Sequence, residues 1–428
     1  MTSIFLGTLA TLVAIGVPVF LVLVAAVAIA MWLEGGMPLA IIAERLFAGL
    51  DKFSLMAIPF FILTGNLMNV GGLSRRLVHL ADLLVGRVTG GLGITTVCSS
   101  MFFGAISGSS PATVIAVGTM LYPSLLKAGY GRPFSLGVVI ASGSLGIIIP
   151  PSIVMIVYAA VTGVSVGALF IAGIGAGIVY GLCFMAYAYY YAWRHDIPRG
   201  AAPKKGALWA SAKDASWGLG VPLVVLGGIY AGLFTPTEAA AVSVVYALFV
   251  SAVIYREKSI AELWGSILES AAQTAQIMII LASASVLSWY LTANGLALAT
   301  TEAILSLSSN PVMILMLINV AVLIAGMLID AASIMVILGP LLYKVGMHIG
   351  VDPIHLGIIL TVNGAIGMYT PPFGLNLFVA SSLGKDVTYG QAVYGSLPFI
   401  LLGIIGLIIV TYVPAISMWL PQQVYQGL

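Results

Sequence analysis

The sequence contains very little charge. Only 16 of its 428 residues are Lys or Arg and 14 are Asp or Glu, so charged residues make up 7% of the chain, whereas they make up about 25% of a typical soluble domain. Hydrophobic residues make up 61%. So few charges cannot cover a soluble surface of this size. We therefore exclude a soluble enzyme, a nucleic-acid-binding protein and a disordered chain, which leaves a polytopic protein embedded in a lipid bilayer.

Residues that mark common catalytic and metal sites are also scarce. The two cysteines, Cys98 and Cys183, lie inside apolar runs, so no disulfide framework is expected. The four histidines are scattered without metal-ligand spacing. The sequence has no Walker motif, no His/Cys cluster and no nucleophile elbow, so we expect neither ATP hydrolysis within the chain nor an organic cofactor.

The apolar runs have the lengths of helices. Strands of a membrane barrel are about 10 residues long and alternate strictly, whereas the runs at 4–33, 165–193 and 390–420 are longer and do not alternate. Their lengths match tilted spanning helices. The sequence therefore predicts an all-α polytopic membrane protein.

The predicted elements fall into three kinds. Full spans are predicted at 4–33, 53–70, 134–164, 165–193, 214–233, 236–255, 273–292, 353–384 and 390–420. Apolar pairs with a polar break in the middle are predicted to form re-entrant helical hairpins at 90–127 and 311–346. Amphipathic segments suit helices at the membrane interface at 38–50, 74–86 and 257–272.

The distribution of basic residues supports this topology. With a cytoplasmic N-terminus and two re-entrant hairpins, all but three of the 16 basic residues lie on the cytoplasmic side, as the positive-inside rule requires. The three exceptions are Arg45, Lys52 and Lys344. The C-terminus then lies on the opposite side of the membrane.

The sequence contains an internal repeat. Residues 142–163 (SGSLGIIIPPSIVMIVYAAVTG) and 363–384 (NGAIGMYTPPFGLNLFVASSLG) align without a gap and carry Gly-x-x-Gly and Pro-Pro at matching positions. An odd number of predicted crossings separates the copies, so the second copy is inverted, as in many secondary transporters. We divide the chain into a first repeat (1–193), a cytoplasmic linker with a connecting span (194–233) and a second repeat (234–428).

The Pro-Pro pairs interrupt the helices predicted at 134–164 and 353–384. Proline has no backbone N–H and disfavours the preceding helical turn, so carbonyl groups one turn earlier lose their partners. Such a group in hydrocarbon costs several kcal/mol unless a cation or a water-lined cavity satisfies it. A simple kink would explain one such break. Two symmetric breaks, each paired with a polar hairpin tip, favour an ion site.

The first hairpin tip is rich in hydroxyl groups. Ser107, Ser109 and Ser110 lie there with one glycine, and Pro111 suits the start of the second half-helix. The N–H groups at that start suit a carboxylate. The alternative is hydroxyl groups that bond back to their own helix, which fits a single serine better than a cluster of three.

The second tip carries Asp330, the only carboxylate that the predicted topology places at depth. A charge there requires a partner, and the candidates are a cation, a proton or hydroxyls such as that of Ser333. The alternative is an N-cap of the helix that follows, and the two roles are compatible. Asn363, Thr370 and Asn376 add side-chain oxygens around the second break.

With these motifs the chain resembles the large membrane subunit of a tripartite ATP-independent periplasmic (TRAP) transporter of the DctM type. The matching stretches include GAISGSSPATVIAVGTMLYPSLLKAGY (104–130), ASGSLGIIIPPSIVMIVYA (141–159) and GVDPIHLGIILTVNGAIGMYTPPFGLNLFVASS (350–382). The GSSPAT tip and the two Pro-Pro segments are specific to this group in combination. The resemblance covers essentially the whole chain.

The resemblance implies a secondary transporter of the ion-transporter superfamily in the bacterial inner membrane, with its C-terminus in the periplasm. A mobile transport domain would move against a scaffold in elevator fashion, driven by a sodium gradient. A periplasmic binding protein would deliver an organic acid. A small membrane subunit of about four spans would complete the complex as a separate chain, because the sequence starts directly with the large subunit's first span.

The resemblance also implies site residues. Sodium, as the coupling ion, would be bound by side chains or backbone carbonyls of Ser107, Ser109, Gly146, Ile149, Pro151, Asn363, Gly367, Thr370 and Pro372. The organic acid would bind between the tips, at Ser109, Ser110, Asp330 and Asn376.

One departure concerns the substrate. Relatives that carry sialic acid often have an Arg just after the Leu-Thr of the span at 273–292, where this chain has Ala293. This argues against sialic acid, and the tip sequence is closest to the C4-dicarboxylate branch. A stand-alone sodium/dicarboxylate or anion symporter of the same superfamily is the alternative within transport. A membrane-embedded enzyme is the alternative from another class, and for it the sequence offers only Asp330 at depth.

Overall fold

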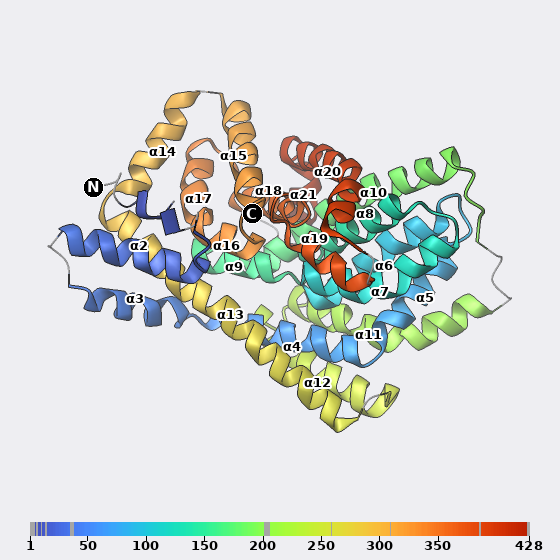
Figure 1. Ribbon diagram of the computed structural model, residues 1–428. Coiled ribbons are helices and arrows are strands. Elements are labelled where there is room, and N and C mark those ends of the chain that lie inside the picture. Colours follow the sequence, from blue (N-terminus) through green and yellow to red (C-terminus); the bar gives the residue numbers. More distant parts are fainter. Residues whose placement is uncertain are drawn as a thin grey trace.

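The computed structural model describes residues 5, 7–9, 11–12, 15–34, 38–200, 206–257, 259–308, 310–384 and 387–425. These residues form helices and no strands (Figure 1), which confirms the predicted all-α fold. Five of their helices are long and apolar enough to cross a membrane, and two sharply bent pairs raise the number to at most seven. The five are Phe53–Val70, Val166–Arg194, Pro236–Tyr255, Ile260–Ala293 and Tyr389–Tyr412.

The helices follow one another in two halves. The first half contains α2 (Val19–Glu34), α3 (Ala40–Leu50), the 3₁₀ turn Phe53–Met56, α4 (Ala57–Val70), α5 (Leu73–Val85), α6 (Gly91–Ser107), α7 (Ser110–Lys127), α8 (Arg132–Gly143), the 3₁₀ turn Ser144–Ile147, α9 (Ile153–Thr162) and α10 (Val166–Arg194). The second half contains α11 (Ala207–Tyr230), α12 (Pro236–Phe249) with the π turn Val250–Tyr255, α13 (Ile260–Ala293), α14 (Leu296–Leu307), α15 (Pro311–Gly326), α16 (Ala331–Ile337), α17 (Gly339–His348), α18 (Pro353–Gly367), α19 (Leu375–Val379), the 3₁₀ turn Ala380–Leu383, α20 (Tyr389–Tyr412) and α21 (Ala415–Val424).

Each half repeats the same order of a helix pair, an interrupted helix and a long helix. In the first half, α6 and α7 contact each other, α8 and α9 flank the cis peptide Pro150–Pro151, and α10 follows. In the second half, α15 and α16 contact each other, α18 and α19 flank the cis peptide Pro371–Pro372, and α20 follows. The helix pairs and the interrupted helices are therefore present. Their re-entrant placement in a membrane and the inversion of the second repeat stay predictions.

The segment predicted as one span at 4–33 is not a single helix. The chain turns at Gly16, whose φ of 77° lies in the left-handed region, and α2 begins at Val19, directly after Pro18. Glycine adopts such a φ without a steric penalty, and proline suits the start of a helix rather than its interior. The uniformly apolar residues on both sides hide this turn in the sequence.

The interfacial helix predicted at 257–272 and the span predicted at 273–292 form one continuous helix, α13. It starts with a capping box, in which Glu262 N–H donates to the Ser259 hydroxyl and Ser259 N–H donates to the Glu262 carboxylate. The charges of Glu262 and Glu269 suggest an interfacial segment in the sequence. Polar residues along one face do not end a long helix, however.

The C-terminal part of the chain and the region before the second hairpin contain helix boundaries that the sequence did not predict. The final span predicted at 390–420 is divided at Pro414, where α20 gives way to α21. The helix α14 lies between the predicted span at 273–292 and the second hairpin, where no helix was predicted. Four basic residues assigned to the cytoplasmic side lie outside the described residues: Lys204, Lys205, Lys258 and Lys385.

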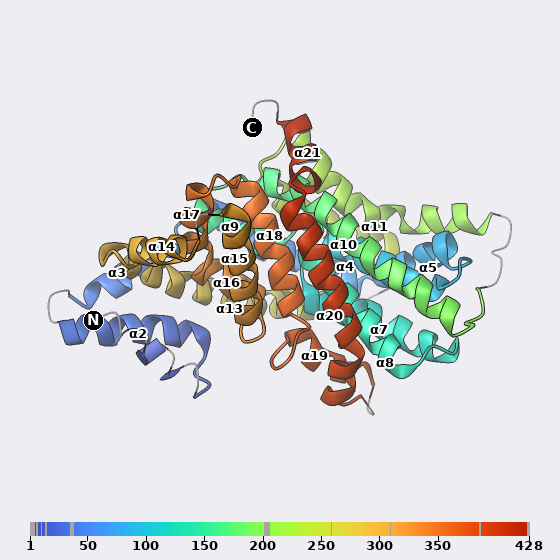
Figure 2. The same ribbon diagram turned by 90° about the horizontal axis from the view of Figure 1, so that it is seen from above.

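The two halves share one core. The long helix α13 runs along α2, α3 and α4 (Figure 1). Helix α8 of the first half packs on α20 of the second half, and α10 lies beside both α18 and α20 (Figure 2). Between them, the hydroxyl oxygens of Tyr180 and Tyr369 are 2.5 Å apart, and the Phe184 ring lies 5.6 Å from that of Phe399. This shared packing holds the two interrupted helices in a fixed relation to each other.

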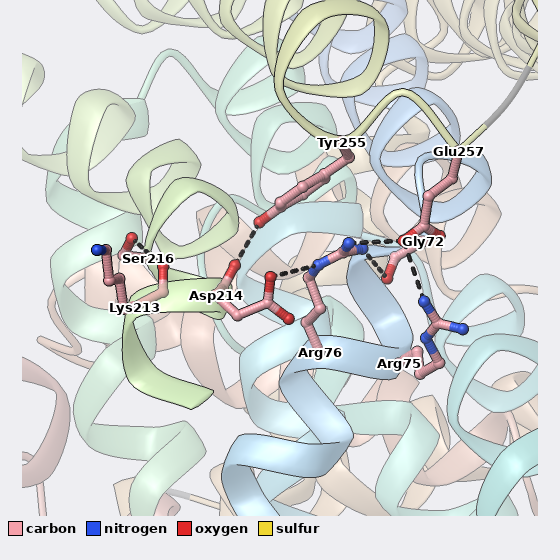
Figure 3. Close-up of polar contacts among 8 residues, drawn as sticks. All are labelled: Gly72, Arg75, Arg76, Lys213, Asp214, Ser216, Tyr255 and Glu257. Atoms are coloured by element: carbon pink, nitrogen blue, oxygen red, sulfur yellow. Dashed lines mark hydrogen bonds and ion pairs between the residues drawn. The ribbon is translucent and has the colours of Figure 1, made fainter. Parts of the chain in front are cut away.

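A group of ion pairs joins α5 to α11 and to the residues after α12 (Figure 3). Arg76 donates from Nε to Asp214 Oδ1 at 3.1 Å and from Nη2 to Glu257 Oε1 at 2.6 Å, and 12% of its side chain is exposed. Its guanidinium carbon lies 3.8 Å from the centre of the Tyr255 ring. Partial burial lowers the pKa of Arg76, but its hydrogen bonds to Glu257 and Asp214 outweigh burial and hold the pKa above its ordinary value. The group fixes α5, α11 and α12 to one another beside α4.

We expect Arg76→Met to lower the free energy of unfolding by about 1–3 kcal/mol, because the largely buried guanidinium of Arg76 joins Asp214 to Glu257, whose side chain is only 28% exposed. The matched control is Arg75→Met. Arg75 bonds the same Glu257 at 3.0 Å, but 71% of its side chain is exposed, so a loss of at most about 0.5 kcal/mol is expected. An unfolding titration in mixed micelles, followed by circular dichroism, measures both variants. Equal losses would contradict the assignment of Arg76 as the centre of the group.

Candidate functional site

A cavity of about 630 Å³ lies between the two hairpin tips and the helices α4 and α13. Residues 107–112 contribute the first tip, and residues 330–332 contribute the second tip. The helices add a polar wall, which we call the α4–α13 wall, formed by Asn66, Asn69, Glu269, Gln273 and Gln276. Polar groups from four separate elements thus converge on one hollow, which makes it the candidate binding site.

The first tip is held together by its own oxygen atoms. Gly108 has a φ of 59°, in the left-handed region, and this lets the chain reverse between α6 and α7. Ser109 precedes α7, and its carbonyl accepts from Thr113 Oγ1 at 2.7 Å. Ser107 Oγ lies 3.1 Å from Thr113 Oγ1. Local hydroxyl bonding is therefore present, and Ser107 and Ser109 also line the cavity. Thr113 was not predicted, although it lies one helical turn after Ser109.

The first interrupted helix presses against this tip. A methyl group at Gly146 would lie 2.6 Å from the Ser109 carbonyl oxygen, and one at Gly108 would lie 2.7 Å from the Pro151 carbonyl oxygen. Contacts this close are possible only because both residues lack a side chain. The structure thereby brings together four of the predicted sodium ligands: Ser107, Ser109, Gly146 and Pro151.

The second interrupted helix meets the second hairpin in a similar way. A methyl group at Gly367 would lie 2.6 Å from the Gly326 carbonyl oxygen. The Phe373 N–H donates to the Met327 carbonyl at 3.1 Å. Thr370 is buried beside this contact, and its hydroxyl donates at 2.7 Å to a carbonyl one turn earlier in α18. Gly367 and Thr370 therefore lie where the break and the hairpin touch.

Two predicted sodium ligands have other contacts. The side chain of Ile149 packs against Gly177 of α10 rather than against the tip. The carbonyl of Pro372 accepts a hydrogen bond from the Tyr389 hydroxyl at 2.6 Å. The described contacts thus do not bring these two residues to the tips, and their part in ion binding stays a prediction.

A buried amide pair lies beside the second break. Asn363 Nδ2 donates to the backbone carbonyl and to Oδ1 of Asn319 at 3.0 and 3.1 Å, and Asn319 in turn donates to Thr411. Asn363 Oδ1 is buried and has no hydrogen-bond partner. A buried oxygen without a partner is costly, so this atom suits a cation or a water molecule. Asn319 was not predicted, although it is the only polar side chain in the apolar run 311–329.

Asp330 is the predicted N-cap and has a hydroxyl partner, whereas its contact with a cation or with the substrate stays a prediction. Its carboxylate caps α16 by accepting from the backbone N–H groups of Ala332 and Ser333 at 3.0 and 3.1 Å, and it also accepts from the Ser333 hydroxyl. Asp330 is half-buried and lines the cavity. The cap holds the carboxylate at the second tip, where it faces the same hollow as the serines of the first tip.

Asn376 and Ser110 form a buried link between the two halves. The Ser110 hydroxyl lies 3.1 Å from Asn376 Oδ1 and 2.8 Å from Asn376 Nδ2, which also donates to the Ile140 carbonyl at 3.1 Å. Ser110 lines the cavity, whereas Asn376 does not. The structure thus supports a role for Asn376 in positioning the first tip, and its direct contact with a substrate stays a prediction.

The α4–α13 wall was not predicted as part of the site. Asn66 donates to Gln273 at 3.2 Å, and Gln273 donates to Glu269 at 3.3 Å. Asp330 was predicted to be the only carboxylate at depth, but Glu269 lines the same cavity. The signal is the spacing of Glu269, Gln273 and Gln276 on one helical face, which is recognisable once α13 is known to be continuous. Among the described lining residues, both charges are negative and none is Lys, Arg or His.

Interrupted helices that face hairpin tips around a polar cavity are characteristic of secondary transporters of the membrane. The family described as "Tripartite ATP-independent periplasmic transporter, DctM component" matches residues 6–416. The chain belongs to this family. It is a TRAP transporter large permease and a multi-pass membrane protein.

Several curated relatives cover nearly the whole chain. The C4-dicarboxylate TRAP transporter large permease protein DctM of Pseudomonas aeruginosa is 43% identical over 89% of each chain. The isethionate TRAP transporter permease protein DctMQ of Oleidesulfovibrio alaskensis is 40% identical over 96% of this chain and 65% of its own length. The ectoine TRAP transporter large permease protein TeaC of Halomonas elongata is 35% identical over 98% of this chain and 99% of its own. All are named as permeases, which agrees with the expectation that the chain is not an enzyme.

Similarity to a solved structure supports the fold. The YdaH transporter of Alcanivorax borkumensis matches with a TM-score of 0.60 over 90% of this chain and 88% of that chain. The sequences are only 18% identical. The likeness therefore concerns the arrangement of helices alone.

We expect Gly367→Ala and Gly146→Ala each to lower the free energy of unfolding by about 1–3 kcal/mol. The added methyl group meets backbone atoms of the facing hairpin, which cannot move as a flexible side chain would. The matched control is Gly227→Ala in α11, where an added methyl group has no atom within 4 Å. This control should be neutral or stabilising by up to about 1 kcal/mol. The same unfolding titration measures all three variants, and a similar change in all of them would rule out a special close approach.

Proposed function

We propose that the chain is the large membrane subunit of a sodium-coupled TRAP transporter that imports a small organic acid across the bacterial inner membrane. The observation that carries this proposal is the single cavity shared by both hairpin tips and the α4–α13 wall. The first tip supplies hydroxyl groups and the start of α7, which suit a carboxylate. The α4–α13 wall supplies amides and a carboxylate that reach the rest of the substrate.

Sodium coupling accounts for the charges in the cavity. Glu269 and Asp330 line it, and no Lys, Arg or His does so among the described lining residues. An organic acid adds at least one further negative charge, and like charges at short range repel strongly where water is scarce. A cation that binds with the acid removes this repulsion. Hydroxyl and backbone oxygens at the contact of Ser107, Ser109 and Gly146 are ligands of the kind that bind Na⁺ at interrupted helices.

The position of the cavity supports an elevator mechanism. Helices α3 and α4 pack on α13 as one group, whereas α8, α18 and α20 form another group with the hairpins. The cavity lies where the two groups meet. We propose that the second group moves against the first and carries the acid and the sodium ions with it.

The named relatives support a substrate class and a set of partners. The relatives are named for C4-dicarboxylates, isethionate and ectoine, all of which carry an acid group, and the C4-dicarboxylate relative is 43% identical. We propose a C4-dicarboxylate or a similar acid, delivered by a periplasmic binding protein. The isethionate relative extends beyond this chain, which covers 65% of it. The remaining part of that relative is long enough for a fused small membrane subunit. For this chain, we propose that the small membrane subunit is a separate partner.

Uptake into proteoliposomes tests the proposal. Labelled succinate, isethionate or ectoine is added outside vesicles that contain the chain and its small subunit. Each probe is added with and without the binding protein whose gene lies nearest to the gene of this chain. We expect accumulation of one probe only with the binding protein and an inward sodium gradient, and none with potassium. Uptake at the same rate without the binding protein would support a stand-alone symporter instead. Uptake independent of sodium would refute the coupling.

Two substitutions test the ion site in the same assay. We expect Ser107→Ala and Asp330→Asn each to raise the sodium concentration for half-maximal uptake about tenfold, which corresponds to the loss of one ligand interaction of about 1.4 kcal/mol. The control for the serine is Ser243→Ala, which removes a buried hydroxyl that lies 2.8 Å from the Thr64 hydroxyl and does not line the cavity. The control for the aspartate is Asp352→Asn, which caps α18 in the way that Asp330 caps α16.

Asparagine retains the capping function at both aspartate positions, so the comparison isolates the negative charge at the cavity. Both controls should keep the wild-type sodium dependence. Wild-type sodium dependence in the Ser107 and Asp330 variants, at equal amounts of reconstituted protein, would exclude these residues from the ion site.

A further inference from the structure

A second hollow region lies further along α13. It consists of two adjoining hollows of about 310 and 240 Å³, which share Val161, Ser288, Thr292, Val336 and Pro340. We call this region the outer cavity. Its basic lining residues are Arg45, Lys52 and Lys344. We propose that the outer cavity is a binding site for the carboxylate or sulfonate group of the substrate, occupied before the acid reaches the hairpin tips. This inference rests on the proposed transport of an organic acid.

The first support is the convergence of the basic residues. Arg45 lies in α3 and Lys52 just after it, whereas Lys344 lies in α17, far away in the sequence, yet all three line this one region. They are also the three basic residues that the predicted topology places on the outer side of the membrane. Basic residues are disfavoured on that side in short loops, so a function that requires positive charge there accounts for all three exceptions at once.

The second support is the contrast between the two cavities. The cavity at the hairpin tips is lined by Glu269 and Asp330 and by no described basic residue. The outer cavity is lined by three basic residues and by no Asp or Glu among its described residues. A cleft lined by one sign of charge raises the local concentration of ions of the opposite sign. The outer cavity therefore attracts an anion that the inner cavity alone repels.

The basic groups have capacity for a ligand. Lys52 Nζ donates to the Ala160 carbonyl at 2.6 Å, and an ammonium group has three donors. The guanidinium of Arg45 lies 5.6 Å from the ring centre of Trp289, and its Nη2 is 3.9 Å from Glu44 Oε1. Arg45 Nε is buried and has no hydrogen-bond partner. A carboxylate or sulfonate bound here would supply an acceptor for this orphaned donor.

The two cavities adjoin each other. Leu281 of α13 and Val336 of α16 line both of them. From Glu269 to Thr292, α13 extends about 35 Å at the 1.5 Å rise per residue of an α-helix, which is close to the roughly 30 Å hydrocarbon thickness of a bilayer. An acid that moves from the outer cavity to the tips would therefore pass these two aliphatic side chains, Leu281 and Val336, which we call the constriction. Val336 lies in the short helix that Asp330 caps, so a shift of the second tip moves one side of this constriction.

Cysteine modification measures the electrostatic potential of the outer cavity. Thr292→Cys places a reporter in it, and Gln276→Cys places a matched reporter in the inner cavity, both in a chain whose Cys98 and Cys183 are replaced by alanine. The rates of reaction with an anionic sulfonatoethyl methanethiosulfonate and a cationic trimethylammonioethyl methanethiosulfonate are compared. We expect the anionic reagent to be favoured at position 292 relative to position 276. An equal or reversed preference at position 292 would overturn the proposal.

Charge removal identifies the source of the potential. The combined variant that removes the outer basic residues should lower the preference for the anionic reagent at position 292 about tenfold and leave position 276 unchanged. It consists of Arg45→Gln, Lys52→Gln and Lys344→Gln. A matched variant removes three exposed basic residues elsewhere and should change neither position. It consists of Arg87→Gln, Lys127→Gln and Lys213→Gln. Equal effects of the two variants would refute a local role of the outer residues.

Protection by succinate and by isethionate tests binding. Either anion, without the binding protein, should slow the reaction at position 292 in a concentration-dependent manner. This protection should disappear in the variant that lacks the outer basic residues and persist in the matched variant. Absence of protection by both anions would overturn the proposal. If sodium-dependent uptake occurs without protection, the transport function stands and the outer site is wrong. If protection occurs without sodium-dependent uptake, the outer anion site stands and the proposed coupling is wrong.

Discussion

The structure depends on one constraint, namely that a backbone polar group in a membrane interior must find a partner within the protein. The two Pro-Pro pairs break the regular helical pairing at two places. The structure restores part of it in two ways: Phe373 of the second break donates its N–H to Met327 of the second hairpin, and within the first break the Ser152 hydroxyl donates to the Ile147 carbonyl at 2.6 Å. The bond to Met327 requires the second hairpin to approach its break closely, and glycines allow such an approach at both breaks. The candidate site is thus a consequence of the same breaks that would otherwise destabilise the helices.

The parts of the site that could be predicted from the sequence have local signals. A Pro-Pro pair interrupts a helix wherever it occurs, and Asp330 caps the helix that follows it, whatever lies nearby. The serines between two apolar arms similarly identify a polar turn. The internal repeat aligns Gly367 with Gly146, so the role predicted for one glycine could be predicted for the other. The structure brings each of these glycines against its hairpin.

The remaining parts could not be predicted, because they depend on which side of a helix meets the cavity. Glu269 and Gln273 lie on one polar face of α13, and a helix that lies at the membrane interface has the same pattern as one that lines a polar cavity. Asn376 is the reverse case, because it was predicted to bind the substrate and does not line the cavity. Its polar side chain after the second break suggests contact with a substrate, whereas the fold buries it against Ser110. Similarly, the sequence gives no sign that Arg45 and Lys52 share a region with Lys344. The structure shows that the three residues line two adjoining hollows.

The scarcity of charge makes the position of each charged residue informative. In the proposed function, an acid at the tips adds its charge to those of Glu269 and Asp330, so acid and sodium each lower the electrostatic cost of binding the other. By linkage, bound sodium raises the affinity for the acid by the same factor as bound acid raises the affinity for sodium. In the proposed function, recognition at the tips relies on hydroxyl groups and helix-start N–H groups, which donate to any carboxylate or sulfonate of suitable size. The tips alone therefore do not discriminate between the acids named for the relatives. The amide and carboxylate side chains of the α4–α13 wall are the part of the cavity that can contact the rest of the substrate and provide this discrimination.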